Sequence, residues 1–174
     1  KLRVRSYRRV ESDDEKVFVE LKKKYNSVVY KRRTVLSENT AAKWLNDGQL
    51  SQEQTQIISE IEYFRRFYGS LVPSAFVSYD REAFFAVDGS DFRVTFDENI
   101  SARTTDLSLK KDVGGEKLLG NGLVLMELKT HSGIPLWMTS LLSENEIYKT
   151  SFSKYGTAYR TMIFPEKGEI KNVC

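Results

Sequence analysis

The residues that could do chemistry are first visible at the start of the chain, in KLRVRSY. Side chains alternate between the two faces of a β-strand, so Lys1, Arg3 and Arg5 share one face while Leu2 and Val4 share the other. Guanidinium groups bind phosphate oxygens through paired donors, and an ammonium group adds a compact positive charge. Such a row of cations is suited to a ligand with several closely spaced negative charges.

The same arrangement recurs along the chain. Five further segments alternate like strands and place Arg or Lys on one side: VFVELKKKY, VVYKRRTV, FVSYDREAF, FRVTFD and VLMELKT. Antiparallel sheets are often solvated on one face, so for any single strand an ordinary wet surface is the simpler interpretation. Solvated faces usually mix both charges with neutral polar residues, whereas cations dominate here and Glu20 and Glu127 are isolated carboxylates.

Composition limits the alternatives. The 174 residues, 40% hydrophobic and 29% charged, suit one globular domain with a real core. The net charge is only +3, so a strongly basic site must arise by sorting charges in space. A single cysteine, Cys174, excludes an internal disulfide, and no apolar run reaches the length of a membrane span. We expect a soluble, cytoplasmic protein, and because the chain starts inside a strand pattern we expect a piece of something longer.

The elements that must position these cations can be read from periodicity and capping. We predict strands over residues 1–9, 16–25, 27–35, 75–87, 91–97 and 123–130, with a long polar loop over 101–121. Ser37 should cap a helix that ends near Asn46, a capping box at Ser51 and Gln54 should begin a second, and Pro135 should start a third. Residues 149–162 are ambiguous.

The apolar sides of these strands and the second helix indicate how the layers pack. Ile57, Ile58, Ile61, Phe64 and Tyr68 form one apolar stripe, which is typical of a helix on the outside of a sheet. If the sheet curls into a barrel with helices outside, the cationic faces converge on the lumen. Unpaired cations packed side by side would repel, so we expect an anionic ligand there.

Together, in this order, KLRVRSY, FVELKKK, VYKRR, YDREAF, FRVTFD, LMELKT and FSKY resemble the polyphosphate polymerase (VTC) domain of the triphosphate tunnel metalloenzyme, or CYTH-like, superfamily. The resemblance implies an α+β fold in which an antiparallel β-tunnel, a closed or partly open barrel, has helices packed outside. It covers nearly the whole chain and implies a single VTC-like tunnel domain, residues 1–174, that lacks the first strands of the family fold and is N-terminally truncated.

The resemblance also implies roles for individual residues. The residues that it places in catalysis are Arg3, Arg5, Lys22, Arg81, Arg93 and Lys129. Those that it places in substrate binding are Lys1, Lys31, Arg33, Tyr79 and Lys154. Glu127 is the implied metal ligand, for Mn²⁺ or Mg²⁺, whereas Glu20 is interpreted as a charge partner of nearby lysines.

The activity implied by the family is transfer of the γ-phosphoryl group of ATP to a growing polyphosphate chain. A triphosphatase of the same superfamily would use the same residues with water as the acceptor. A non-catalytic module that binds polyphosphate or inositol phosphates is favoured by the missing first strands and by Ser151, where the family has a lysine. ATP and polyphosphate are the expected partners, with a chain or segment that supplies the missing strands. Nucleic acid is not expected, because the cationic faces carry few aromatic rings.

Overall fold

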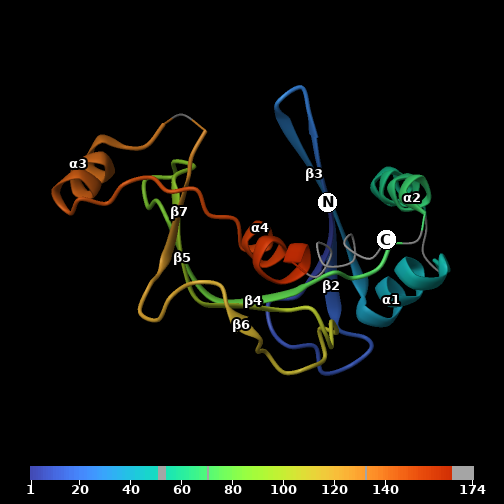
Figure 1. Ribbon diagram of the computed structural model, residues 1–174. Coiled ribbons are helices and arrows are strands. Elements are labelled where there is room, and N and C mark those ends of the chain that lie inside the picture. The colour runs from blue at the N-terminus through green and yellow to red at the C-terminus, as the bar shows by residue number, and fades with distance from the viewer. Residues whose placement is uncertain (51–53, 70, 132, 166–174) are drawn as a thin grey trace. The chain divides into compact units, whose positions relative to one another are not determined.

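The computed structural model describes residues 1–50, 54–69, 71–131 and 133–165 (Figure 1). The chain divides into two compact units. Unit 1 contains Lys1–Ser74 and Asp106–Val113, and unit 2 contains Ala75–Thr105 and Gly114–Cys174. Each unit has its own sheet, and each is described separately below.

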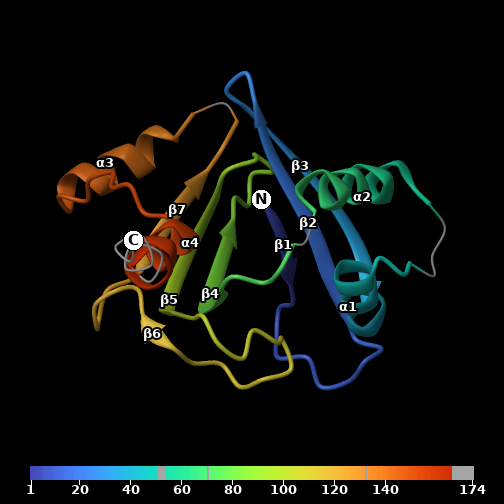
Figure 2. The same cartoon turned by 45° about the vertical axis from the view of Figure 1, so that its right-hand side comes forward.

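The sheet of unit 1 is an antiparallel meander of β1 (Leu2–Arg5), β2 (Lys16–Tyr25) and β3 (Val28–Ser37), in that order (Figure 2). Two residues with positive φ, Asn26 and Ser27, join β2 to β3, which is the backbone geometry that a tight two-residue hairpin requires. The predicted second and third strands are confirmed, whereas the first is shorter than residues 1–9. The register sets Glu20 between Arg3 and Arg33.

The other face of this sheet is the core of unit 1. Helices α1 (Glu38–Asp47) and α2 (Gln56–Tyr68) bury it. The fully or nearly fully buried side chains there include Val17, Val19, Leu21, Trp44 and Ile61. The predicted alternation of apolar and cationic faces is therefore confirmed in unit 1, and its two helices pack on the apolar face.

The helix boundaries of unit 1 follow their caps. Ser37 caps α1 as predicted, because its hydroxyl accepts a hydrogen bond from the Thr40 N–H at 3.2 Å. The prediction for α2 was wrong, since this helix begins after Thr55, whose side chain accepts from the Ile58 N–H. Ser51, which the predicted capping box used, lies outside the described residues.

The sheet of unit 2 is centred on β5 (Arg93–Arg103). It pairs antiparallel with β4 (Phe76–Phe85), with β7 (Leu125–Lys129) and with the two-residue β6 (Glu116–Lys117). β5 runs beyond the predicted 91–97, and β6 lies in the stretch predicted to be a loop. Part of that stretch, Asp106–Val113, belongs to unit 1, where the Val10 N–H donates to the Leu109 carbonyl at 3.1 Å.

The apolar face of the unit 2 sheet packs on α3 (Leu136–Glu144), whose N-cap position is Pro135. The side chains that meet there are Phe92, Val94, Phe96, Met126, Leu128, Met138 and Leu142. The alternation in FRVTFD and LMELKT is therefore confirmed, since Val94 and Phe96 face this core. Arg93, Thr95 and Asp97 lie on the opposite, polar face.

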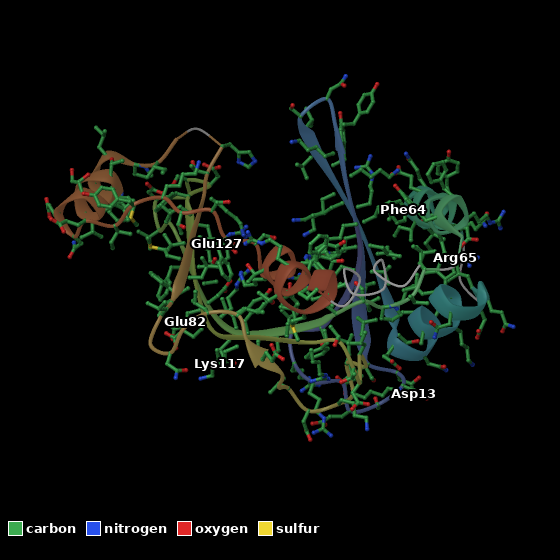
Figure 3. All side chains as sticks on the ribbon, viewed as in Figure 1. Asp13, Phe64, Arg65, Glu82, Lys117 and Glu127 are labelled. Atoms are coloured by element: carbon green, nitrogen blue, oxygen red, sulfur yellow. The ribbon has the colours of Figure 1, made fainter. Side chains whose placement is uncertain are left out.

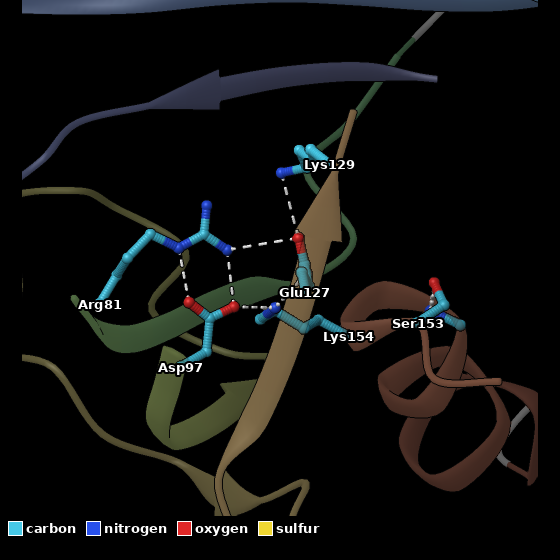
Figure 4. A network of polar contacts seen from close by, with 7 residues as sticks. Arg81, Asp97, Glu127, Lys129, Ser153 and Lys154 are labelled. Atoms are coloured by element: carbon cyan, nitrogen blue, oxygen red, sulfur yellow. Dashed lines mark hydrogen bonds and ion pairs between the residues drawn. The ribbon is translucent and has the colours of Figure 1, made fainter. Parts of the chain in front are cut away.

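The ambiguous stretch 149–162 contains α4 (Lys154–Ala158), followed by a single π-helical turn, η1 (Tyr159–Ile163). The Ser153 hydroxyl caps α4 by accepting from the Gly156 N–H. Lys154, the first residue of α4, reaches the polar face of the unit 2 sheet (Figure 4). The sequence left this segment ambiguous, and its first helix contacts the polar face, whereas α1, α2 and α3 pack on apolar faces.

The α+β class with antiparallel sheets is confirmed. In the described ranges the strands form two separate hydrogen-bonded sheets, so no closed barrel is formed by strand pairing. The tunnel thus remains a prediction. No helix in the described part of the chain has the length and apolar character needed to cross a bilayer.

Candidate functional site

The polar face of unit 1 holds a buried carboxylate surrounded by cations. Glu20 is only 1% exposed and lies at the centre of β2. Arg3 Nε donates to Glu20 Oε2 at 3.0 Å, and Arg33 Nε donates to Oε1 at 2.9 Å. The Lys31 ammonium lies 3.2 Å from Oε1, and Arg5 Nη2 lies 3.6 Å away. We call these five residues the Glu20 cluster.

The charge balance of the Glu20 cluster is uneven. Burial raises the pKa of Glu20, but hydrogen bonds from Arg3, Arg33 and Lys31 outweigh it and hold that pKa at about 2. The carboxylate is therefore ionised at neutral pH, yet it is shared by four cations. The cluster keeps an excess of positive charge on this face of the sheet.

Two more predicted cations extend the same face. Lys22 lies directly across from Lys31 in the strand register. Burial, followed by the positive charges of Arg3 and Lys22, lowers the pKa of Lys1. The crowding of like charges that the sequence predicted is thus present at this end of the sheet, where it opposes protonation of an ammonium group.

The polar face of unit 2 is built around two carboxylates (Figure 4). Arg81 binds the fully buried Asp97 through two donors, Nε to Oδ1 at 2.5 Å and Nη2 to Oδ2 at 2.6 Å. Lys154 pairs with Asp97 and lies 3.1 Å from Glu127 Oε1. Lys129 lies 3.2 Å and Arg81 3.7 Å from Glu127 Oε2. We call these five residues the Asp97–Glu127 cluster.

These two carboxylates are not equally accessible. Glu127, labelled in Figure 3, lies on β7. Its side chain is 33% exposed, whereas that of Asp97 is fully buried. Burial raises the pKa of each, but hydrogen bonds and charges outweigh it: Lys154 and Lys129 lower the pKa of Glu127, and Arg81 and Lys154 lower that of Asp97. Both are therefore ionised at neutral pH.

Aromatic rings steady several of these cations. The Tyr79 ring lies 5.0 Å from the Arg81 guanidinium carbon and 4.7 Å from Lys154 Nζ, so it contacts two cations at once. In unit 1 the Phe18 ring lies 4.8 Å from the guanidinium carbon of Arg33. Tyr79 is thus a support for the basic groups as well as a predicted contact to substrate.

Some donors on the polar faces have no partner. Within the described residues, three buried side-chain atoms make no hydrogen bond: Arg5 Nε, Arg93 Nε and Thr95 Oγ1. All three belong to residues on the two polar faces. Among the described residues, no carboxylate lies within ion-pair distance of Arg93. The guanidinium carbon of Arg93 lies 5.5 Å from the centre of the Phe85 ring. Buried donors without partners are uncommon and are often explained by a ligand or water.

A family model described as the VTC domain matches residues 1–163. The chain belongs to the VTC domain family. The match includes every residue that the sequence assigns to the site and confirms the suspected resemblance. It links this protein to polyphosphate, while a comparison with curated proteins gave no match.

The VTC domain brings most of the predicted residues together within each unit. Arg3, Arg5, Lys31 and Arg33 meet at Glu20, and Arg81, Lys129 and Lys154 meet at Glu127. The expectation of unpaired cations was wrong for these residues, because internal carboxylates partly neutralise them. Glu20 is a charge partner as predicted, but three of its four cations are arginines.

Sequence reasoning missed Asp97 in the VTC domain. The alternation in FRVTFD places Asp97 on the face of Arg93, yet nothing local shows which cation it meets. The register of β4 against β5 sets Arg81 opposite Asp97. Helix α4 adds Lys154, which is 57 positions after Asp97 in the sequence. Only these long-range pairings reveal that Asp97 anchors the cluster.

The fit of a metal to the VTC domain can be judged from its donor atoms. The described residues contain no group of three or more His, Cys, Asp or Glu side chains able to hold an ion. Glu127 is a partly accessible carboxylate, although Lys129 and Lys154 occupy its oxygens. Mg²⁺ is commonly bound by one or two carboxylates with phosphate oxygens and water completing its shell. Glu127 fits that pattern only when phosphates supply further ligands.

Proposed function

We propose that this VTC domain binds ATP and polyphosphate in the basic tunnel that its family resemblance implies. There it transfers the γ-phosphoryl group of ATP to the end of a polyphosphate chain with Mn²⁺ or Mg²⁺. The observation that carries the proposal is the excess of cations around Glu20, where four positive groups share one buried carboxylate. A polyanion is the ligand that would balance this charge.

The transfer chemistry needs few specialised groups. A terminal phosphate oxygen of the chain forms a bond to the γ-phosphorus, the bond from that phosphorus to the β–γ bridging oxygen breaks, and ADP leaves with the electron pair. The transition state is loose and places charge on peripheral oxygens, so catalysis is mostly positioning and neutralisation. The attacking oxygen is already ionised, and no general base is required.

Arginines supply the positioning in this proposal. Arg5 has a buried Nε without a partner and is the cation most distant from Glu20, at 3.6 Å. It can turn its donors to a phosphate while Arg3 and Arg33 keep Glu20 satisfied. Arg81 is held rigidly by Asp97 and has one nitrogen near Glu127, which suits a fixed contact to a reacting phosphate.

Glu127 is the residue that would hold the metal, together with phosphate oxygens. A divalent cation there supplies charge that offsets the oxygens of the transferred group. Lys129 and Lys154 would then exchange Glu127 for phosphate oxygens, since both contact its carboxylate at 3.1–3.2 Å. This exchange keeps every charge paired when the substrate is bound.

The experiment uses the full chain with ATP and Mn²⁺. Polyphosphate length is followed on gels, free phosphate is measured separately, and tripolyphosphate binding is measured by calorimetry. We expect long polyphosphate as the product, and we expect Arg5→Ala and Glu127→Ala each to abolish its formation. Lys23→Ala is the control for loss of a charged side chain outside the polar face, because Lys23 pairs with Glu60 of α2.

Other products would change the assignment. Free phosphate without polymer would replace the polymerase by a triphosphatase that uses the same residues. Tight binding of tripolyphosphate without turnover would leave a non-catalytic binder. Full polymer synthesis in both the Arg5 and Glu127 variants would overturn the site, and failure to bind any phosphate chain would overturn the proposal as a whole.

A further inference from the structure

Thr95 carries a buried hydroxyl that nothing in the described residues satisfies. The residue is 3% exposed, and its Oγ1 makes no hydrogen bond. A hydroxyl removed from water without a partner destabilises the folded state. Valine has nearly the same shape and an equal preference for strands, and it would avoid this cost. Packing alone therefore gives no reason for a hydroxyl here.

The position of Thr95 suggests what the hydroxyl is for. Thr95 lies on the polar face of β5, with Arg93 and Asp97 two residues away on either side. Its cross-strand neighbours are Glu127 on β7 and Ala83 on β4. The hydroxyl is thus an uncharged polar group among the charged groups of the polar face.

A second orphaned donor lies close by in the register. Arg93 Nε is also buried without a hydrogen bond, and Arg93 shares the face of Thr95. A guanidinium can only donate, so the missing partner of Arg93 must be an acceptor. A hydroxyl can donate to the same kind of group. Phosphoryl oxygens are acceptors only, and they would satisfy both residues.

From this geometry we infer that the Thr95 hydroxyl donates a hydrogen bond to a phosphoryl oxygen of a bound phosphate chain, beside Arg93. Thr95 is then a further substrate-binding residue, and the inference rests on the proposed function. Because Thr95 is buried, the phosphate chain reaches its hydroxyl only when neighbouring side chains move. Lys129 is the neighbour best able to move, because its side chain is 46% exposed. It would release the Glu127 carboxylate and bind a phosphate oxygen instead.

The test compares Thr95→Val with Thr95→Ser. Valine keeps the shape and removes the donor, whereas serine keeps the donor. Without ligand, we expect Thr95→Val to melt at the wild-type temperature or a few degrees higher, because an unsatisfied hydroxyl is lost. The same variant should bind tripolyphosphate roughly ten-fold more weakly, since a hydrogen bond to a charged oxygen is lost. Thr95→Ser should bind within about two-fold of wild type on the same reasoning.

Weaker binding without a loss of thermal stability in Thr95→Val distinguishes the inference from a structural role. If Thr95→Val lowers the melting temperature, the hydroxyl has a partner within the protein and the inference is overturned. If wild type binds tripolyphosphate and Thr95→Val binds it equally well, the inference fails while the proposed function stands. If wild type itself does not bind, the proposed function fails, and the inference fails with it.

Discussion

The two polar clusters use the same residue types with different charge balances. In unit 1 one carboxylate serves four cations, and in unit 2 two carboxylates serve three. Glu20 is 1% exposed, whereas Glu127 keeps about a third of its side chain accessible. The comparison shows that unit 1 holds positive charge in excess, and that unit 2 leaves one carboxylate partly accessible to solvent.

The two clusters also differ in how they are assembled. All four cations around Glu20 come from β1 and β3, so the meander alone builds that cluster. The Asp97–Glu127 cluster needs Lys154 from α4 in addition to its strands. The first cluster is fixed by strand pairing within one meander, whereas the second also depends on the packing of a helix that is not part of the sheet.

The largest difference is expected when each carboxylate is neutralised. Glu20→Gln leaves four cations, 18–43% exposed, around a buried side chain without charge. Because water partly screens these cations, the free energy of unfolding should fall by roughly 2–3 kcal/mol. Glu127→Gln should lower it by only about 1 kcal/mol, because Arg81 and Lys154 retain Asp97. Urea denaturation measures both values. Equal losses in the two variants would show that the clusters do not differ in the way described.

Glu127→Gln should affect activity much more than it affects stability. Glu127→Gln should reduce metal-dependent polymer formation by roughly 100-fold or more, because charge stabilisation of the transferred group is lost. Its affinity for tripolyphosphate without metal should stay near that of wild type. Turnover rates at saturating ATP and Mn²⁺ give the first value and calorimetry the second. Unchanged turnover would remove Glu127 from the metal site.

Acid should weaken unit 1 through Glu20. The pKa of Glu20 is about 2 in the folded protein and near 4.5 when unfolded, so its stabilisation is complete above pH 4.5 and disappears as the pH falls toward 2. The stability difference between wild type and Glu20→Gln should therefore shrink by on the order of 2 kcal/mol between pH 5 and pH 2. Glu62, whose pKa is also about 2, titrates in both proteins and cancels in this difference.

Urea titrations of the two proteins at several pH values measure that difference. A gap that stays constant down to pH 2 would mean that the charge of Glu20 does not stabilise the fold.

The smallest effect should come from a single exposed cation. Lys31→Ala should weaken tripolyphosphate binding about three- to ten-fold, with a stability change below about 1 kcal/mol, because three arginines still satisfy Glu20. Lys23→Ala, with 40% exposure against 43% for Lys31, removes a comparable lysine from the opposite face. Calorimetry should show wild-type affinity for Lys23→Ala, and equal weakening in both would indicate non-specific attraction.

Much of the fold follows from local sequence patterns. The alternation in KLRVRSY, VFVELKKKY and FRVTFD predicts which face of each strand is cationic, and the structure agrees. The Ser37 cap was also predictable, because its side chain bonds within one turn of its own helix. The start of α2 was not predictable, because several residues before this helix could have served as its N-cap.

The amino-acid sequence by itself determined the faces of the strands, the cationic character of the site and the family, because alternation is a property of the extended backbone itself. Only the tertiary structure decided which charges meet. The pairing of Arg81 with Asp97, the arrival of Lys154 from α4 and the isolation of the Thr95 hydroxyl depend on strand register and burial. Those properties arise when segments far apart in the chain pack together, and no local pattern encodes them.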